Sequence, residues 1–234
     1  MAAVGQKVQN VMKKVFTVFV LLALSVAVYA QKDVTKFLGI PVDGSKTEMI
    51  QELKAKGFTY DKALDRLYGT FNGYDVNVYI VTNNDKVYRI MVCDKYSQDA
   101  GDIKIRFNTL CRQFLDNKKY VSLSENDIEI PESENIAYEM TVNNKRYEAC
   151  FFQLPEDTTA IMKKAREVVL SYKKERLANP SEELEKDMMK TIYSYVLDQY
   201  MNKTVWFMIG GEYGQYSIYM FYDNKYNQAN GEDL

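Results

Sequence analysis

Apolar residues along this chain recur with two different periods, and the changes between them predict the order of helices and strands. Spacings of three and four residues predict a helix that begins near Ser45 or Thr47, and Gly57 is placed to end it. Apolar and polar residues then alternate, which is typical of half-buried strands. These strands are expected at 64–71, 74–82 and 86–93. Asn72-Gly73, between the first two strands, is a strong local signal for a hairpin turn.

The same succession of helix and hairpin is predicted twice more. The second unit is expected to hold a helix from about 99–102 to 115, a short strand at 120–123, and hairpin strands at 136–142 and 145–154. In the third unit, an apolar stripe predicts a helix over 161–177. Asn179-Pro180-Ser181-Glu182 then supplies an N-cap, a proline in the first turn and a capping-box glutamate for a second helix ending near Asn202. Its hairpin strands are expected at 205–209 and 215–222, with the turn at Gly210-Gly211.

These elements predict an α+β protein: an antiparallel sheet built from three helix-plus-hairpin units, with the helices packed on one face. The units are expected at about 45–93, 99–154 and 157–223. Together they form a single α+β domain over 31–223, followed by a polar C-terminal tail at 224–234. One continuous sheet and two abutting modules both agree with this pattern, and the absence of a linker rich in Pro, Ser or Gly favours one compact body.

Residues 1–30 have the layout of a secretory signal peptide. A pair of lysines precedes the apolar run 15–24, and Val28 and Ala30 stand at the −3 and −1 positions of a small-residue cleavage signal. Cleavage is expected between Ala30 and Gln31. Because the apolar segment is shorter than the roughly 20 residues that span a bilayer, we expect an exported protein, periplasmic or secreted, with no membrane span after removal of the signal.

Charge and composition exclude several classes of function. Removal of residues 1–30, with three lysines and no acids, leaves 27 basic and 32 acidic residues, a net charge of −5. A mildly acidic chain without a basic stripe is not expected to bind nucleic acid. The sequence contains no histidine, so the commonest general base and metal ligand is missing. We therefore expect no enzyme, no cofactor and no metal.

Three cysteines remain, Cys93, Cys111 and Cys150, and an odd number leaves at least one unpaired in an oxidising compartment. They are expected to be small buried hydrophobic residues. A single disulfide stays open as an alternative, because the sequence does not fix the distances between them.

Several segments carry a resemblance to known exported proteins. They are Gly39-Ile40-Pro41 through Lys56-Gly57-Phe58, the meander 69–92, and the tail 219–234. The first two segments resemble the helix-plus-hairpin modules of the β-lactamase-inhibitory-protein group and the related outer-membrane-assembly lipoproteins. The tail is similar to that of uncharacterised exported proteins of Bacteroidetes-type bacteria. The resemblance implies binding to other proteins or a role at the cell envelope, without specific functional residues.

The aromatic content supplies the candidate binding face. The chain holds 19 tyrosines and one tryptophan, and Tyr79, Tyr219 and Phe221 fall on the strand face opposite the predicted core. Rigid aromatic side chains on a sheet suit contact with a protein or a glycan, although packing inside the protein is the plainer alternative. We therefore expect a non-catalytic exported binding or scaffold protein of the bacterial envelope that uses a sheet face to contact a protein or glycan.

A carboxylate-dependent hydrolase of extracellular polymers is the alternative function, since paired acids can cleave glycosides without histidine. The acidic clusters that would supply such a pair are Glu125, Asp127 and Glu129; Glu132 and Glu134; and Glu182, Glu183 and Glu185. Two of these clusters are also explained as a solvated loop, and the third as charge at a helix N-terminus.

Overall fold

The computed structural model describes residues 33–122, 128–155, 159–178, 182–229 and 231. Contacts divide the chain into two units, Met1–Asp33 and Val34–Leu234, and the second is the one described below. The predicted signal peptide and its cleavage site at Ala30 and Gln31 lie outside the described residues. Within the described ranges, no helix is long and apolar enough to cross a membrane.

The fold is α+β, as predicted, and the described residues form five α-helices and a single large sheet. The helices are α2 (Lys46–Ala55), α3 (Ala100–Asp116), α4 (Ile136–Val142), α5 (Thr159–Ala178) and α6 (Glu182–Met201), with a 3-10 helix η1 (Lys225–Asn227). The sheet strands are β3 (Thr59–Asp61), β4 (Arg66–Phe71), β5 (Tyr74–Asn83), β6 (Lys86–Asp94), β7 (Tyr120–Val121), β8 (Glu148–Gln153), β9 (Thr204–Glu212) and β10 (Gln215–Asp223). All eight pair antiparallel in the order β3-β4-β5-β6-β10-β9-β8-β7. A separate ribbon pairs β1 (Lys36–Phe37) with β2 (Ile40–Pro41).

The helix and the three strands predicted for the first unit are confirmed. Their caps and turns are specified by residues only a few positions apart. Ser45 is the N-cap of α2, and it exchanges side-chain and backbone hydrogen bonds with Glu48 in a full capping box. Asn72 and Gly73 both adopt positive φ, 51° and 79°, which is the backbone of the predicted hairpin turn between β4 and β5. Strand β3 is an addition that the alternation did not predict.

The predicted strand 136–142 is wrong, since these residues form helix α4. Asn135 caps the helix by accepting a hydrogen bond from the backbone N–H of Tyr138 at 3.1 Å, and Ile136 is buried. Asn144 has a φ of 52°, so the Asn pair ends a helix here instead of turning a hairpin. The second unit therefore contributes no hairpin, and the threefold repeat is not seen in the described part of the chain.

The hairpin turn of the third unit also lies elsewhere than predicted. β9 continues through Gly210 and Gly211, and the turn residues with positive φ are Tyr213 (53°) and Gly214 (79°). A Cβ on Gly210 would lie 2.7 Å from the ring of Tyr219 on β10. Gly210 therefore lets an aromatic ring lie against the strand, so this glycine serves packing within the sheet.

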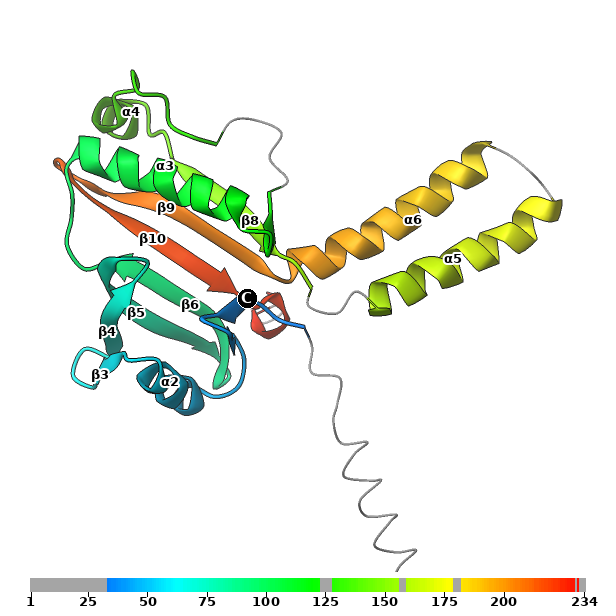
Figure 1. Cartoon of the computed structure of the whole chain (residues 1–234), viewed down its shortest axis with the longest axis horizontal. Helices are drawn as coiled ribbons and strands as arrows, with labels where there is room; N and C mark the ends of the chain where they lie inside the picture. Colours follow the sequence, from blue (N-terminus) through cyan, green and yellow to red (C-terminus); the bar gives the residue numbers. More distant parts are fainter. Residues whose placement is uncertain (1–32, 123–127, 156–158, 179–181, 230, 232–234) are drawn as a thin grey trace, which may run out of the picture. The chain divides into compact units, whose positions relative to one another are not determined.

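One face of the sheet carries the hydrophobic core. Its strand residues alternate with those of the other face, and cross-strand pairs such as Val78↔Val92, Met220↔Val92 and Met220↔Phe207 keep them in register. Helices α2 and α3 bury their apolar residues in the same cluster. Figure 1 shows α3 running along β9 and β10, and α2 beside β5 and β6.

A buried ion pair fixes α3 to the sheet. Arg106 of α3 donates two hydrogen bonds to Asp94 at the end of β6, at 2.7 and 2.5 Å, and the two side chains are 4% and 3% exposed. Asp94 also accepts the backbone N–H of Ile218 on β10 at 3.2 Å. The guanidinium lies 3.4 Å from the centroid of the Tyr74 ring. The carboxylate and the guanidinium thus have close polar or aromatic contacts inside the protein.

We predict that Arg106→Ala lowers the free energy of unfolding by about 3–5 kcal/mol, because it leaves the Asp94 carboxylate buried without its cation. Urea unfolding followed by circular dichroism measures this loss. The matched control is Arg112→Ala on the same helix, whose ion pair with Glu129 is more exposed, and it should cost less than about 1 kcal/mol. Equal losses in the two variants would contradict the role given to the buried pair.

Candidate functional site

The sheet face opposite the core carries a continuous row of large side chains. The register places Tyr79, Met91, Phe221, Trp206 and Cys150 side by side across β5, β6, β10, β9 and β8. Apart from Phe221, which is 9% exposed, they are half-buried or exposed.

A second row lies next to the first. It consists of Cys93, Tyr219 and Met208, which are half-buried, flanked by the buried Asn77 and the exposed Glu148. We call the two rows together the outer face. Helices α2 and α3 bury their apolar residues in the core on the opposite side of the sheet.

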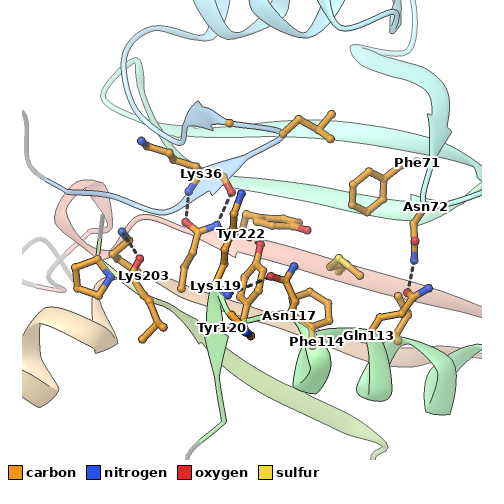
Figure 2. A pocket seen from close by; sticks show the side chains of 18 of the residues that line it. Lys36, Phe71, Asn72, Gln113, Phe114, Asn117, Lys119, Tyr120, Lys203 and Tyr222 are labelled. Carbon is orange, nitrogen blue, oxygen red and sulfur yellow. Dashed lines mark hydrogen bonds between the residues drawn. The ribbon is translucent and has the colours of Figure 1, made fainter. Parts of the chain in front are cut away.

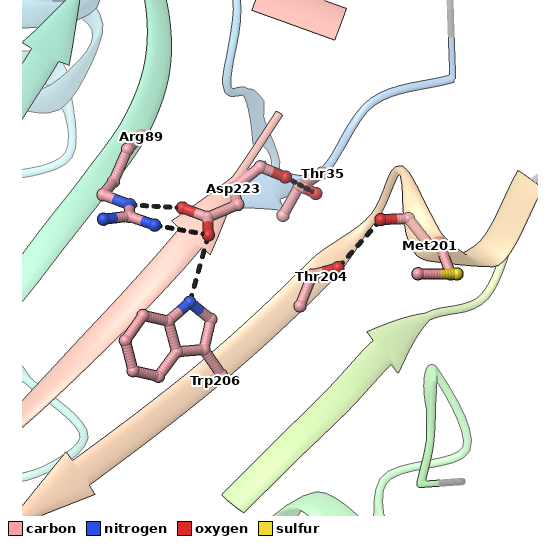
Figure 3. Close-up of polar contacts among 6 residues, drawn as sticks. All are labelled: Thr35, Arg89, Met201, Thr204, Trp206 and Asp223. Carbon is pink, nitrogen blue, oxygen red and sulfur yellow. Dashed lines mark hydrogen bonds and ion pairs between the residues drawn. The ribbon is translucent and has the colours of Figure 1, made fainter. Parts of the chain in front are cut away.

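A charged network locks the aromatic part of the outer face. Phe221 stacks on Trp206 with ring centroids 4.1 Å apart and an angle of 18°. Arg89 donates to both oxygens of Asp223, at 2.5 and 2.8 Å, and the Trp206 indole N–H donates to the same carboxylate at 3.0 Å (Figure 3). The guanidinium also lies 4.9 Å from the Phe221 ring centroid. These contacts hold two rings and a guanidinium in one fixed arrangement.

Electrostatics within this network keep Arg89 charged. Its hydrogen bonds to Asp223 raise the pKa of the guanidinium, although burial opposes that shift. Thr35, just before β1, donates its hydroxyl to the backbone carbonyl of Asp223. The network is therefore tied to the N-terminal segment of this unit, 188 residues away in sequence.

Tyr219 sits on the second row, with its ring against Gly210. Its pKa is raised, first by the neighbouring Cys93 thiol and then by burial, so its hydroxyl stays a neutral donor and acceptor at neutral pH. Tyr79 pairs with Met91 and is also half-buried.

The structure brings all three predicted face residues, Tyr79, Tyr219 and Phe221, to the same side of the sheet. Phe221 is nevertheless packed against Trp206 and Arg89. Its ring therefore stabilises the outer face and leaves little area exposed for contact with a partner.

Sequence reasoning missed Trp206, Met208, Met91 and Arg89. The sequence did contain a signal for Trp206 and Met208. They alternate with the apolar Val205, Phe207 and Ile209, so they must point to the other side of the strand. Nothing local indicated that Arg89 and Asp223 would meet, since they lie 134 residues apart.

The cysteines are free thiols: Cys93 is half-buried, Cys111 is buried and Cys150 is exposed. The sequence left a single disulfide open as an alternative, and the structure shows none among these three described cysteines. Partial desolvation of the sulfur raises the pKa of both Cys93 and Cys150, and Asp223 and Glu148 raise the pKa of Cys150 further. A raised pKa disfavours the thiolate that a cysteine nucleophile needs.

Two acids of these clusters are engaged in ion pairs. Glu129 accepts from Arg112 at 2.6 Å, and Glu134 accepts from Lys145 and Tyr147. These hydrogen bonds lower the pKa of Glu134, which makes it a poor proton donor at neutral pH.

The structure describes only some of the remaining acids of the hydrolase alternative. Glu125 and Asp127 lie outside the described residues, as do the side chains of Glu182 and Glu185. Among the residues that the structure describes, no group of three or more Cys, Asp or Glu is placed to hold a metal ion.

No protein-family model, curated protein or solved structure matches this chain. The resemblance to the β-lactamase-inhibitory-protein group stays a prediction.

We predict that a disulfide reagent such as Ellman's reagent modifies one thiol rapidly in the folded protein, that of Cys150, since it is the exposed cysteine. Because the pKa of Cys150 lies above its ordinary 9.0, the modification rate should keep rising with pH beyond that value. Absorbance of the released thiolate measures the rate. Cys150→Ser should remove the fast phase, and a rate that levels off near neutral pH would contradict the assigned environment.

Proposed function

We propose that this chain is a non-catalytic exported protein of the bacterial envelope, periplasmic or secreted, that binds another protein through its outer face. The observation that carries the proposal is the row Tyr79–Met91–Phe221–Trp206–Cys150, which runs across five adjacent strands. Tyrosine, tryptophan, phenylalanine, methionine and arginine are the residue types enriched at protein interfaces. The two rows of the outer face contain the first four types, and Arg89 lies beside them against the Phe221 ring.

A protein suits the outer face better than a glycan does. Sugar recognition needs an open aromatic ring together with polar groups that can bind hydroxyls. Here one face of the Trp206 ring is covered by Phe221, and the Asp223 carboxylate already accepts from Arg89 and from the indole. The half-buried methionines Met91 and Met208 add adaptable apolar area, which favours contact with another apolar surface.

A binding or scaffold role is also supported by the chemistry of the site. The chain has no histidine, the thiols of Cys93 and Cys150 have raised pKa values, and Glu134 has a lowered one. The resemblance of the first unit to the β-lactamase-inhibitory-protein group supports the same proposal. In the third unit, the helices α5 and α6 precede the β9–β10 hairpin.

We predict that Tyr79→Ser together with Tyr219→Ser weakens partner capture from a native envelope fraction by about tenfold or more, because both rings are lost from the outer face. The matched control replaces two exposed tyrosines, Tyr96→Ser with Tyr213→Ser, and should leave capture unchanged. Capture is quantified on immobilised protein, below the melting temperatures of both variants.

A second measurement locates the contact. A photo-crosslinker attached to Cys150 should join the partner, whereas the same reagent on Lys54→Cys, in a Cys150→Ser background, should not. Trp206 is the chain's single tryptophan, so partner binding should also shift the intrinsic fluorescence. Equal capture by both tyrosine variants, or a crosslink only from position 54, would show that the outer face is not the binding surface. A captured polysaccharide would replace the protein partner with a glycan.

A further inference from the structure

A cleft lies on the other side of the sheet, between the β1–β2 ribbon and the C-terminal half of α3. Its volume is about 1020 Å³, which is at the upper end of the range for small-ligand sites. Met220 and Tyr222 of β10 line it from the sheet, and Leu38 and Phe71 line it from the β1–β2 and β4–β5 hairpins. Tyr222 and Phe71 are labelled in Figure 2.

The charged residues that line the cleft are all lysines: Lys36, Lys118, Lys119 and Lys203, with no Asp or Glu among the described lining residues. This is unexpected in a chain with more acidic than basic residues. Lys118 and Lys119 directly follow α3, where cations also stabilise the helix dipole. Lys36 on β1 and Lys203 before β9 also line the cleft, so its lysines come from three parts of the chain. Lys203 is buried, and its ammonium donates to the Leu154 carbonyl at 3.3 Å.

The cleft has a cationic part and an apolar part. In Figure 2, Lys36, Lys119 and Lys203 lie on one side of the view, and Phe71 lies on the other. Leu110 and Phe114 of α3 add apolar surface to the cleft. A ligand with a charged end and an apolar body would match both parts.

The tyrosines of the cleft do not offset its positive charge. Burial raises the pKa of both Tyr120 and Tyr222, so their hydroxyls stay neutral at neutral pH. Tyr120 accepts a hydrogen bond from the Gln153 side chain at 3.2 Å, which orients its ring at the cationic part. Lysines are therefore the charged side chains that the described residues bring to the cleft.

Hydrogen bonds from side-chain amides connect the walls of the cleft and fix their positions relative to one another. Gln153 accepts from the backbone N–H of Lys36 at 2.7 Å and donates to its carbonyl at 3.1 Å, so it joins β1 to β8. Asn72 donates to Gln113 of α3 at 2.8 Å, and this bond joins the β4–β5 turn to the helix. Such ties at both ends make the cleft a preformed site.

The turn of the β1–β2 ribbon brings an apolar side chain, Leu38, to the cleft. Its backbone is strained at this position. Leu38 has a φ of 52° and Gly39 a φ of 82° in the two-residue turn of the ribbon. Asn, Asp or Gly is the usual residue at the first of these positions, because a bulky side chain is crowded in the left-handed region. Leu38 is also 38% exposed, so burial in the core does not explain its choice.

We propose that this cleft binds a small amphipathic anion, with its charged head group at the lysines and its apolar body against Phe71, Phe114 and Met220. The site is separate from the outer face. The two share strands β8 and β10, whose alternate residues point to opposite sides of the sheet.

Two fluorescent probes with the same aromatic body test the proposal. Anilinonaphthalene sulfonate carries an anionic group that phenylnaphthylamine lacks. We expect the anionic probe to bind about tenfold more tightly at low salt, and the difference to shrink as salt is raised. Dodecanoate should displace the bound anionic probe, whereas dodecanol and inorganic phosphate should do so poorly, because each lacks one half of the ligand.

Variants assign the binding to this cleft. Lys118→Gln with Lys119→Gln should weaken the anionic probe about fivefold and leave the neutral probe within about twofold. The matched control, Lys54→Gln with Lys56→Gln, removes two exposed lysines outside the cleft and should change neither affinity. Leu38→Asn should raise the urea midpoint, since it relieves the turn, yet weaken both probes.

The proposal is overturned by any of four results: no saturable binding of the anionic probe, equal affinity for the two probes, equal effects of the two lysine pairs, or displacement by phosphate as effective as by dodecanoate. The increase in stability expected for Leu38→Asn shows that lost binding in that variant is not unfolding. Partner capture by the outer face is measured separately on the same lysine variants, and it should be unchanged.

Discussion

The pairing of β6 with β10 is the constraint on which the rest of the molecule depends. It joins strands more than 120 residues apart, with Tyr219 opposite Cys93 and Asp223 opposite Arg89. A slip by one residue would turn every side chain of β10 to the other face, since strand side chains alternate. The core residues Met220 and Tyr222 would then exchange places with Tyr219 and Phe221.

Polar contacts at both ends hold this register. At one end, Asp94 accepts from the backbone of Ile218 and from Arg106 on α3, so the helix and the strand pair are fixed together. At the other end, Arg89 pairs with Asp223, and the backbone N–H of Asn224 donates to Tyr88. Because each carboxylate would lose several partners on slipping, the ion pairs contribute specificity as well as stability.

β10 thereby builds two surfaces of opposite character. Towards the helices, Met220 and Tyr222 line the cleft that is surrounded by lysines. Towards the other side, Phe221 supports Trp206 and Arg89 on the outer face. One strand can serve two binding proposals because its side chains alternate and because its neighbours β6 and β9 keep both rows in line.

The sequence by itself determined the elements that carry their own signals: the Ser45 capping box, the Asn72-Gly73 turn, the helices α3, α5 and α6, and the alternation of β5, β6 and β10. It also placed Tyr79, Tyr219 and Phe221 on one strand face, since period-2 alternation is local. It failed at 136–142, where an alternating apolar pattern forms a helix capped by Asn135, and at the turn near Gly210, where a glycine accommodates the Tyr219 ring. Only the tertiary structure decided that β6 pairs with β10, that Arg89 meets Asp223 and Trp206, and that lysines from three parts of the chain line one cleft. The reason is physical: capping and alternation depend on residues a few positions apart, whereas strand order and ion pairing depend on contacts between residues more than a hundred positions apart, which no local pattern encodes.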